Sequence, residues 1–471
     1  MENDNTKTLK KNRYVIDTGE KKTETVMSVL FMAAYYIFPQ YFGFDTPFFD
    51  FSVQRIMIVL FLIFTFEKQR RTQQLWGQAF KSCGHVWLFI YLFILLYTAI
   101  ARSHAGTFLY SAIEALAMFI VIYIAREGIG VKKFVNLINT FAAVLCISGL
   151  IEYVMKRSPF SYLETIDDLY CGALVRGGYY RIMGPANHAL GYGLILITMA
   201  SFIFIDVETD KISLWNHPVL LALLTINVFL TGSRSTLGIY LMQLAIVFIM
   251  CSAEEKRKTI IILVAVLAVV VPLVVVTSNM SFSRYLIRTF LTVVDQIFGT
   301  SFAVRFGADV STLANSSAYR SQLNRIFGLK WLDPLLGQGS QYQFYWKTDN
   351  GFTIQSIDNA YIAMYIRYGY PGMISYIIYI VVVGITMLVW GIKKKSGLFL
   401  ALFVGYLGYF INLRYVDTLQ TIKYAYIAFA VFFACYDSKN KEYIPYCIRT
   451  EEPQKKEAVS SEVTHFKYLR R

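Results

Sequence analysis

The sequence predicts an all-α polytopic membrane protein, with about twelve transmembrane helices and one large helical loop before the tenth span. Apolar residues make up 56% of the 471-residue chain and charged residues only 16%. A soluble protein of this length carries about a quarter charged residues. The apolar residues also cluster into runs close to the ~20 residues that cross a bilayer as a helix.

The apolar runs and the charged segments between them predict both the spans and their orientation. Most lysine and arginine between the runs falls in short segments on the same side as both chain ends. The positive-inside rule makes this side cytoplasmic, so the net charge of +14 reflects topology and not nucleic-acid binding. The expected spans are 25–44, 51–66, 84–101, 108–125, 134–155, 187–205, 217–232, 235–252, 259–277, 371–391, 397–413 and 421–436.

This topology divides the chain into five parts. They are a cytoplasmic N-terminal tail (1–24), transmembrane helices 1–9 (25–277), a large extracytoplasmic loop (278–370), transmembrane helices 10–12 (371–436) and a cytoplasmic C-terminal tail (437–471). Arginine supplies five of the seven basic residues between positions 278 and 357, and its planar fork suits phosphate oxygens. No Cys/His cluster has the spacing of metal ligands, so we expect no metal and no cofactor.

Two short motifs stand where outer loops meet spans. In "VRGGYYRIMGPANHALGYG" (175–193), Arg181 precedes a Gly-Pro pair, and Asn187 is either a helix cap or a ligand. The same motif carries His188, which lacks partners for a metal site.

The second motif, "FLTGSRSTLGIY" (229–240), reads as a tight turn that holds Arg234. With Ser235 or Thr236 as cap, the following helix start offers free N–H donors and a small anion site. The alternative is an arginine that only snorkels to the membrane interface.

The large loop contains two amphipathic segments with arginines. "SRYLIRTFLTVVDQIF" (283–298) predicts an interfacial helix, with Arg288 either at lipid headgroups or at substrate. "SAYRSQLNRIFGLKWLDPLLGQGS" (317–340) predicts a helix from Ala318 to Leu332 that carries Arg320 and Arg325. Arg320 shares a face with apolar side chains and is either a surface residue or an anion ligand in a cleft.

The loop ends in "SIDNAYIAMYIRYGYPGM" (356–373), in which a helical pattern runs to a Gly-Tyr-Pro-Gly break. Asp358 stands at the start of that helix, where aspartate is a favoured cap. It is also predicted to lie on the outer face beside the arginines, so it is a candidate catalytic group. Asn359 and Tyr361 suit contacts with sugar rings.

Together these motifs resemble the polysaccharide polymerase and O-antigen ligase superfamily, the Wzy- and WaaL-type enzymes. The resemblance covers roughly residues 134–415. It rests on Arg181 with "GPAN", on the "LTGSR" turn, and on a large loop in which "R…W…PLLGQGS" precedes "DNAYIAMYIRYGYPG". Their order and topological placement are more specific than any one of them.

The resemblance implies a GT-C-like, membrane-embedded glycosyltransferase that needs neither metal nor cofactor. The setting is the bacterial cytoplasmic (inner) membrane, with both termini cytoplasmic and the active site outside. Donor and acceptor are oligosaccharide repeats on undecaprenyl pyrophosphate, and the acceptor hydroxyl attacks the anomeric carbon with inversion. A chain-length regulator and a flippase are candidate partners, and nucleic acid is not.

The resemblance also implies roles for individual residues. Arg234 and Arg320 stabilise the leaving pyrophosphate, and Arg181 and Arg288 support donor binding. Asp358 stands where the ligase branch commonly has histidine, as the base or as a group that orients the acceptor. The remaining candidate substrate-binding residues are Asn187, Asn359, Tyr361 and Arg325.

Three functions fit this pattern, and the polymerase of a cell-surface polysaccharide (O-antigen, capsule or exopolysaccharide) is favoured. The aspartate at position 358 argues for polymerase over an O-antigen or other glycan ligase. A flippase or transporter of lipid-linked oligosaccharide has a similar number of spans. Transporters, however, place charged sites near the membrane midplane, often in repeat-related halves, and no such repeat is visible.

Overall fold

Apolar helices dominate the computed structural model, as the clustered apolar residues predict. The structure describes residues 18–46, 50–80, 82–166, 170, 172–176, 179–306, 319–349, 351, 353–437 and 442–443. Four helices are long and apolar enough to cross a membrane by length and composition: α5 with the π-helical turn that follows it, α6, α10 and α13. The chain is therefore a mostly helical membrane protein.

Each predicted span coincides with an apolar helix, although the number that actually cross the membrane stays a prediction. At the first span the helix ends at Ile37 and not at residue 44, because Pro39 follows it, and at the tenth span the helix begins at Ala360 and not at residue 371. The helices are α1 (Thr18–Ile37), α2 (Val53–Phe66), α3 (Gln69–Ala79), α4 (His85–Ala101), α5 (Gly106–Tyr123), α6 (Val131–Met155), α7 (Ala189–Ile203), α8 (Pro218–Leu230), α9 (Arg234–Met250), α10 (Ala253–Val276), α11 (Ser281–Phe298), α13 (Ala360–Lys394), α14 (Gly397–Asn412) and α15 (Ile422–Cys435).

Shorter elements join these helices. A π-helical turn (Ile124–Gly128) continues α5, and 3₁₀ turns occupy Pro159–Leu163, Phe302–Phe306 and Asn324–Gly328. The strands of the described residues form short antiparallel pairs: β1 (Gly43–Phe44) with β2 (Phe51–Ser52), β3 (Leu174–Arg176) with β4 (Tyr179–Arg181), β5 (Ile205–Asp206) with β6 (Lys211–Ile212), β7 (Trp346–Lys347) with β8 (Thr353–Ile354), and β9 (Tyr436–Asp437) with β10 (Glu442–Tyr443).

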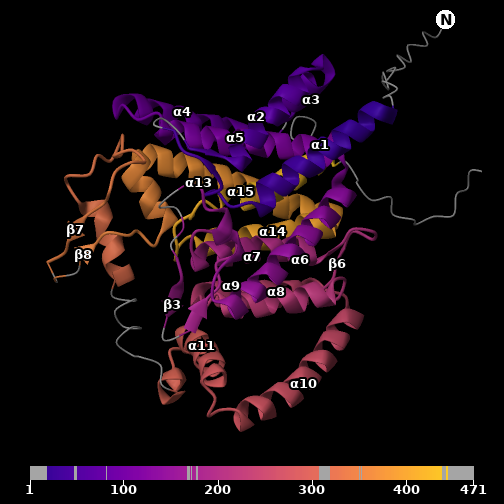
Figure 1. Cartoon of the computed structure of the whole chain (residues 1–471), viewed down its shortest axis with the longest axis vertical. Helices are drawn as coiled ribbons and strands as arrows, with labels where there is room; N and C mark the ends of the chain where they lie inside the picture. Colours follow the sequence, from indigo (N-terminus) through magenta and orange to yellow (C-terminus); the bar gives the residue numbers. More distant parts are fainter. Residues whose placement is uncertain are drawn as a thin grey trace, which may run out of the picture.

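The helices pack in layers around the C-terminal three (Figure 1). Helix α13 lies against α4, α15 against α5, and α14 against α7 and α9. Helices α1–α5 lie on one side of this centre, and α6, α8, α10 and α11 lie on the other. The buried core runs through all these contacts, so the last spans of the sequence organise the first ones.

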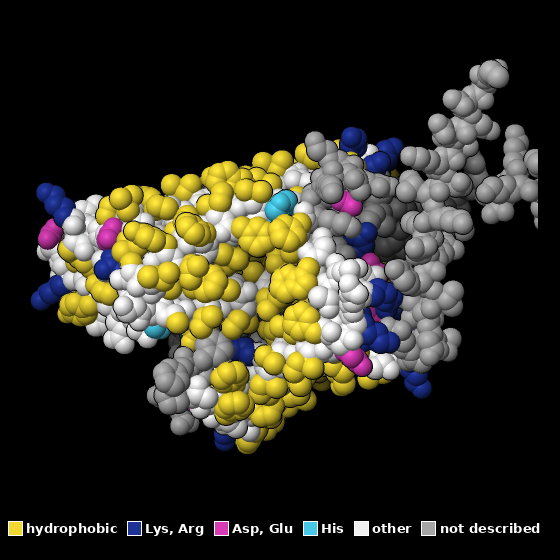
Figure 2. Space-filling model, turned by 90° about the horizontal axis from the view of Figure 1, so that it is seen from above, with side chains coloured by type: hydrophobic (Ala, Val, Ile, Leu, Met, Phe, Trp, Pro, Cys, Tyr) yellow, Lys and Arg dark blue, Asp and Glu magenta, His cyan; other side chains and the backbone are white. Residues whose placement is uncertain are grey.

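The surface agrees with a membrane setting. Figure 2 shows one face on which hydrophobic side chains form a broad area, with charged side chains mostly toward its two ends. Helix α10 is the extreme case, since its apolar window is exposed throughout. A helix that is apolar and exposed all round is suited to contact with lipid.

Helix α13 is broken at Gly369, where the Gly-Tyr-Pro-Gly motif predicts a break. Gly369 has φ 66° and ψ −174°, a conformation available mainly to glycine. Pro371 has no N–H, so the carbonyl of Arg367 loses its helical donor. The break would leave backbone groups unsatisfied near the membrane, which costs several kcal/mol each.

The "PLLGQGS" segment supplies the missing partners. Gln338 N–H donates to the carbonyl of Ile366 (2.8 Å) and Gly339 N–H to that of Arg367 (2.9 Å). In return, Tyr370 N–H donates to the carbonyl of Pro334 (2.7 Å). The loop and the helix therefore meet backbone to backbone.

The same segment is tied to the turn between α4 and α5. Arg102 donates through Nε to the carbonyl of Gly337 (2.9 Å) and forms an ion pair with Asp333 (3.2 Å). Thr107 Oγ1 lies 3.2 Å from Ser340 Oγ. Residues 333–340, called here the glycine clasp, thus join α13 to the N-terminal helices.

Substitution of Gly369 by alanine tests the clasp. A Cβ at Gly369 would lie 2.7 Å from the backbone of Leu335, so the main chain must move. Gly130 is the matched control, because its φ of 82° and ψ of 147° are also strained for any residue but glycine, while a Cβ added there would meet no heavy atom within 4 Å. We expect Gly130→Ala to cost about 1–3 kcal/mol through backbone strain and Gly369→Ala to lower the Tm of the detergent-purified protein further. Equal Tm losses would contradict this account.

Candidate active site

Asp358 does not cap α13, although it stands beside the helix start. The N-cap is Asn359, whose side chain accepts from Tyr361 N–H (3.0 Å) and Ile362 N–H (3.2 Å). The interpretation of Asp358 as a cap is therefore wrong by one residue. Because Asn359 Oδ1 accepts the hydrogen bonds that cap the helix, the Asp358 carboxylate does not cap it and instead lines the adjacent cavity.

That cavity, called the Asp358 cavity, has a volume of about 810 Å³. Its walls come from the loop before α13, the start of α13, the start of α7 and the loop between α14 and α15. The described lining includes His188, Tyr342, Phe344, Tyr345, Gln355, Ser356, Asp358, Arg367, Val416 and Asp417. It is large enough for a small-molecule site, which typically occupies ~300–1,000 Å³.

Arg367 and Asp417 form an ion pair of 3.0 Å on the wall of this cavity. Neither residue was predicted as a site residue from the sequence. Arg367 lies within the quoted helical stretch 356–373, and Asp417 lies in the short loop between two predicted spans. Fifty residues separate them, and no spacing pattern links such a pair.

Asp358 sits between groups that act on it in opposite directions. Burial raises the pKa of its carboxyl above the ordinary value, and the negative charge of Asp417 raises it further. The charge of Arg320 and a hydrogen bond from Ser356 Oγ (3.4 Å) lower it. Arg320 itself lies over Tyr415, with Cζ 5.6 Å from the ring centroid. The structure thus brings Asp358 and Arg320 together, as the sequence predicts.

His188, and not Asn187, caps α7. Leu190 N–H donates to His188 Nδ1 (3.0 Å), so the cap interpretation of Asn187 is wrong. The imidazole lines the Asp358 cavity and is close enough to Arg181 to interact electrostatically with its guanidinium. His188 therefore connects the Asp358 cavity, near Arg320, with Arg181, which belongs to a second group of predicted arginines.

The second group forms around the "LTGSR" turn. Arg181, at the end of β4 and 7% exposed, donates through Nε to the carbonyl of Thr231 (2.7 Å). Ser233 caps α9 by accepting from Thr236 N–H, so the predicted caps at Ser235 and Thr236 are wrong. The helix begins at Arg234 itself, which is partly buried at the first helical position.

Helix α11 closes over this turn. A Cβ on Gly232 would lie 2.7 Å from Tyr285 Oη and 3.2 Å from Arg181 Cγ, so the three residues are in contact. Tyr285 stacks on Tyr179 with centroids 4.3 Å apart, and Arg288 Cζ lies 5.8 Å from the Tyr179 ring centroid. The turn at Gly232 therefore lies close to three of the predicted arginines: Arg181, Arg234 and Arg288.

Glu152 holds the "RIMGPAN" segment in place. Its carboxylate is fully buried and accepts from Met183 N–H (2.8 Å), Gly184 N–H (2.8 Å) and Tyr180 Oη (3.1 Å). These bonds fix the turn directly after Arg181. Glu152 was not predicted from the sequence, because a single acid near the end of an apolar run gives no sign of its partners.

The helix that carries Arg320 is shorter than predicted. Residues 319–323 are helical, but the chain then tightens to a 3₁₀ turn that ends at Gly328, four residues before Leu332. The predicted first residue, Ala318, lies outside the described part of the chain. Arg325 on this turn is exposed and does not line the Asp358 cavity. Its predicted role stays a prediction.

Two tyrosines of the helical stretch before the break are used in packing. Tyr361 Oη donates to the carbonyl of Phe410 on α14 (2.7 Å), and Tyr365 packs on Phe327 with centroids 4.9 Å apart.

Within the described residues, no group of three or more His, Cys, Asp or Glu side chains is placed to hold a metal ion.

Substitution of Glu152 by glutamine tests its role in holding the Arg181 segment. One of the two backbone donors would then face an NH₂ group, and an unsatisfied buried donor costs about 1–3 kcal/mol. Tyr180→Phe is the control, because it removes only one O–H and leaves the carboxylate. We expect the Tm of purified protein to fall more for Glu152→Gln than for Tyr180→Phe, and the reverse order would contradict this role.

Comparison with known proteins agrees with this geometry. A protein-family model described as O-antigen ligase matches residues 219–377, roughly a third of the chain, from α8 through the first half of α13. A comparison with curated proteins found no match. The matched segment contains Arg234, Arg288, Arg320, Asp358 and the glycine clasp. Over residues 219–377 this chain is thus similar to the O-antigen ligase family.

Proposed function

We propose that the protein is a polymerase that joins oligosaccharide repeats carried on undecaprenyl pyrophosphate, at the outer face of the cytoplasmic membrane. The observation that carries the proposal is Asp358. Its carboxylate is released from capping by Asn359, lines a cavity of about 810 Å³ and is opposed by Arg320. The matched family supports glycan transfer from a lipid-linked substrate.

The proposed reaction is a direct displacement. A hydroxyl oxygen of the acceptor sugar forms a bond to the anomeric carbon of the donor as the bond from that carbon to the pyrophosphate oxygen breaks. The hydroxyl proton passes to the Asp358 carboxylate. Undecaprenyl pyrophosphate leaves with the bonding electron pair, and the new glycosidic bond has inverted configuration.

The raised pKa of Asp358 suits it to this task. General-base catalysis is most effective when the pKa of the base approaches the working pH, and burial moves this carboxyl in that direction. The positive charge of Arg320 opposes this rise and favours the carboxylate form. The carboxylate both orients the hydroxyl and accepts its proton.

His188 is a poorer base, although it lines the same cavity. Its Nδ1 accepts a hydrogen bond from Leu190 N–H, so the ring proton of the neutral form is on Nε2. That tautomer offers the cavity a donor and no lone pair. His188 is better suited to donate a hydrogen bond to substrate.

The arginines are suited to neutralise the negative charge of the leaving pyrophosphate. A pyrophosphate needs neutralisation more than protonation, and preorganised donors at developing charge are a large source of catalysis. Arg320 acts at Asp358, while Arg181, Arg234 and Arg288 surround the "LTGSR" turn. A donor that spans both groups would place its anomeric carbon near Asp358 and its lipid toward α11.

A glycan ligase is the second candidate, favoured by the description of the matched family. The ligase branch commonly has histidine at the position of Asp358, and this chain does not. The two functions differ in acceptor. In a deletion strain, loss of long-chain polymer on lipid indicates a polymerase, and persistence of that polymer with failed attachment to a surface acceptor indicates a ligase.

Alanine substitutions test the site assignment. We expect Asp358→Ala and Arg320→Ala each to reduce the polymerisation rate about 100-fold or more, as for loss of a base or of an oxyanion donor. Arg234→Ala should have a similar effect. The control is Arg284→Ala, an exposed arginine on α11 whose guanidinium donates to the carbonyl of Asn279.

The readout is polymer length on gels, with membrane abundance of each variant measured in parallel. Wild-type polymer from all three variants would overturn the assignment.

The pH dependence of the rate tests whether Asp358 is the base. Only the carboxylate form accepts the proton, so the rate rises with pH through this pKa. Arg320 lowers that pKa, so Arg320→Gln should raise it and move the acidic limb of the rate–pH profile to higher pH. The pH of this limb can be measured even if the substitution also lowers the maximal rate. Arg284→Gln should leave the limb in place, and an unmoved limb in Arg320→Gln would argue against Asp358 as base.

A further inference from the structure

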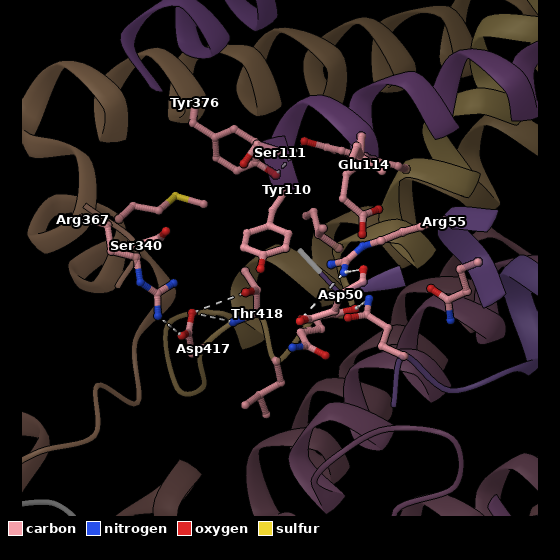
Figure 3. A pocket seen from close by; sticks show the side chains of 18 of the residues that line it. Asp50, Arg55, Tyr110, Ser111, Glu114, Ser340, Arg367, Tyr376, Asp417 and Thr418 are labelled. Carbon is pink, nitrogen blue, oxygen red and sulfur yellow. Dashed lines mark hydrogen bonds and ion pairs between the residues drawn. The ribbon is translucent and has the colours of Figure 1, made fainter. Parts of the chain in front are cut away.

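A second cavity lies on the other side of the Arg367–Asp417 ion pair. It has a volume of about 580 Å³, and it shares Arg367, Asp417 and Leu419 with the Asp358 cavity. Figure 3 shows Arg367, Ser340 and Asp417 on one side of Tyr110, and Asp50 and Arg55 on the other. We call this the Tyr110 cavity. The ion pair is thus a common wall between two hollows.

The Tyr110 cavity has no excess of positive charge, because Asp50, Glu114 and Asp417 on its lining outnumber Arg55 and Arg367. Arg55 pairs with Asp50 (3.9 Å) and lies over Tyr110, with Cζ 4.8 Å from the ring centroid. Arg367 pairs with Asp417. A diphosphate would meet no excess of positive charge here.

Glu114, the third acid on the lining of the Tyr110 cavity, also has partners. It accepts from Tyr35 Oη (2.9 Å) and lies within electrostatic reach of the buried Lys423. These carboxylates can accept hydrogen bonds from neutral hydroxyl groups, and the lining offers no surplus of cations to a pyrophosphate.

The rest of the lining combines flat rings with short polar groups. Tyrosines line it from several helices, with glutamines, serines and a threonine between them. Tyr91 and Tyr376, for example, lie with ring centroids 4.9 Å apart. Tyrosine offers both an apolar face and a polar edge, and amides and carboxylates both accept hydrogen bonds from hydroxyls. This composition suits an uncharged sugar.

We propose that the Tyr110 cavity binds uncharged sugars at the non-reducing end of the acceptor repeat. This inference rests on the proposed polymerase function. The donor reacts at the carbon bonded to pyrophosphate, so its reacting end belongs near the arginines. The acceptor reacts at a sugar remote from its own pyrophosphate, so its reacting end needs a site for neutral sugars beside the Asp358 cavity, with which the Tyr110 cavity shares Arg367, Asp417 and Leu419.

The origin of the walls gives this cavity a role in specificity. Much of its lining comes from α1, α2, α5 and the start of α15, and these lie outside the segment matched by the family model. The Asp358 cavity, in contrast, draws most of its lining from within or next to that segment. The shared chemistry and the choice of acceptor sugar thus reside in different parts of the chain.

The test separates binding of sugar from binding of pyrophosphate in purified full-length protein in lipid nanodiscs. The first probe is the single repeat of the host's polysaccharide, released without phosphate. The second is geranylgeranyl pyrophosphate, which carries no sugar. We expect Tyr110→Ala to weaken binding of the repeat about tenfold and leave binding of the pyrophosphate unchanged. Arg320→Ala should do the reverse.

Tyr162→Ala is the matched control, because Tyr162 is also stacked by an arginine, Arg157 at 4.4 Å, and lines neither cavity. A second variant, Gln341→Trp, narrows the cavity at an exposed lining residue and should also weaken binding of the repeat. Wild-type binding of the repeat by both Tyr110→Ala and Gln341→Trp would overturn the proposal. The polymerase function fails separately, if a deletion strain still makes long-chain polymer on lipid.

Discussion

The backbone bonds between the glycine clasp and the break in α13 are the constraint on which the rest of the structure depends. A helix that breaks next to an apolar medium must find partners for the groups it releases. Here Gln338 and Gly339 supply donors, and Pro334 supplies an acceptor. Since the clasp is also tied to Arg102, the helix break, the large loop and the N-terminal helices form one connected unit.

This connection positions the chemistry. Arg367 lies two residues before the break, and its carbonyl is one of the groups that the clasp satisfies. Its side chain reaches Asp417 and completes the wall between the Asp358 and Tyr110 cavities. At the other end of the Asp358 cavity, Glu152 fixes the turn after Arg181. Two sets of hydrogen bonds thus hold the segments that carry Arg367 and Arg181.

Much of the fold follows from the sequence, and less of the site does. Hydropathy locates each apolar helix because burial in lipid is a property of the segment itself. The break at Gly369 is equally local. The caps at His188, Ser233 and Asn359 were each placed one to three residues away, because several neighbouring residues can cap and only packing decides between them. Asp417 and Glu152 were missed because the partner of Asp417 lies 50 residues away and the backbone partners of Glu152 lie 31 and 32 residues away.

The glycine clasp meets α13 through main-chain atoms, and this has a consequence for how such proteins diverge. A Cβ at Gly337 would collide with the backbone of Tyr368, and one at Gly369 with that of Leu335. Most other positions in the contact contribute only an amide or a carbonyl, which every residue except proline can offer in full. The side chains around the clasp can therefore change without loss of its backbone bonds to α13, whereas Gly337 and Gly369 leave no room for a Cβ.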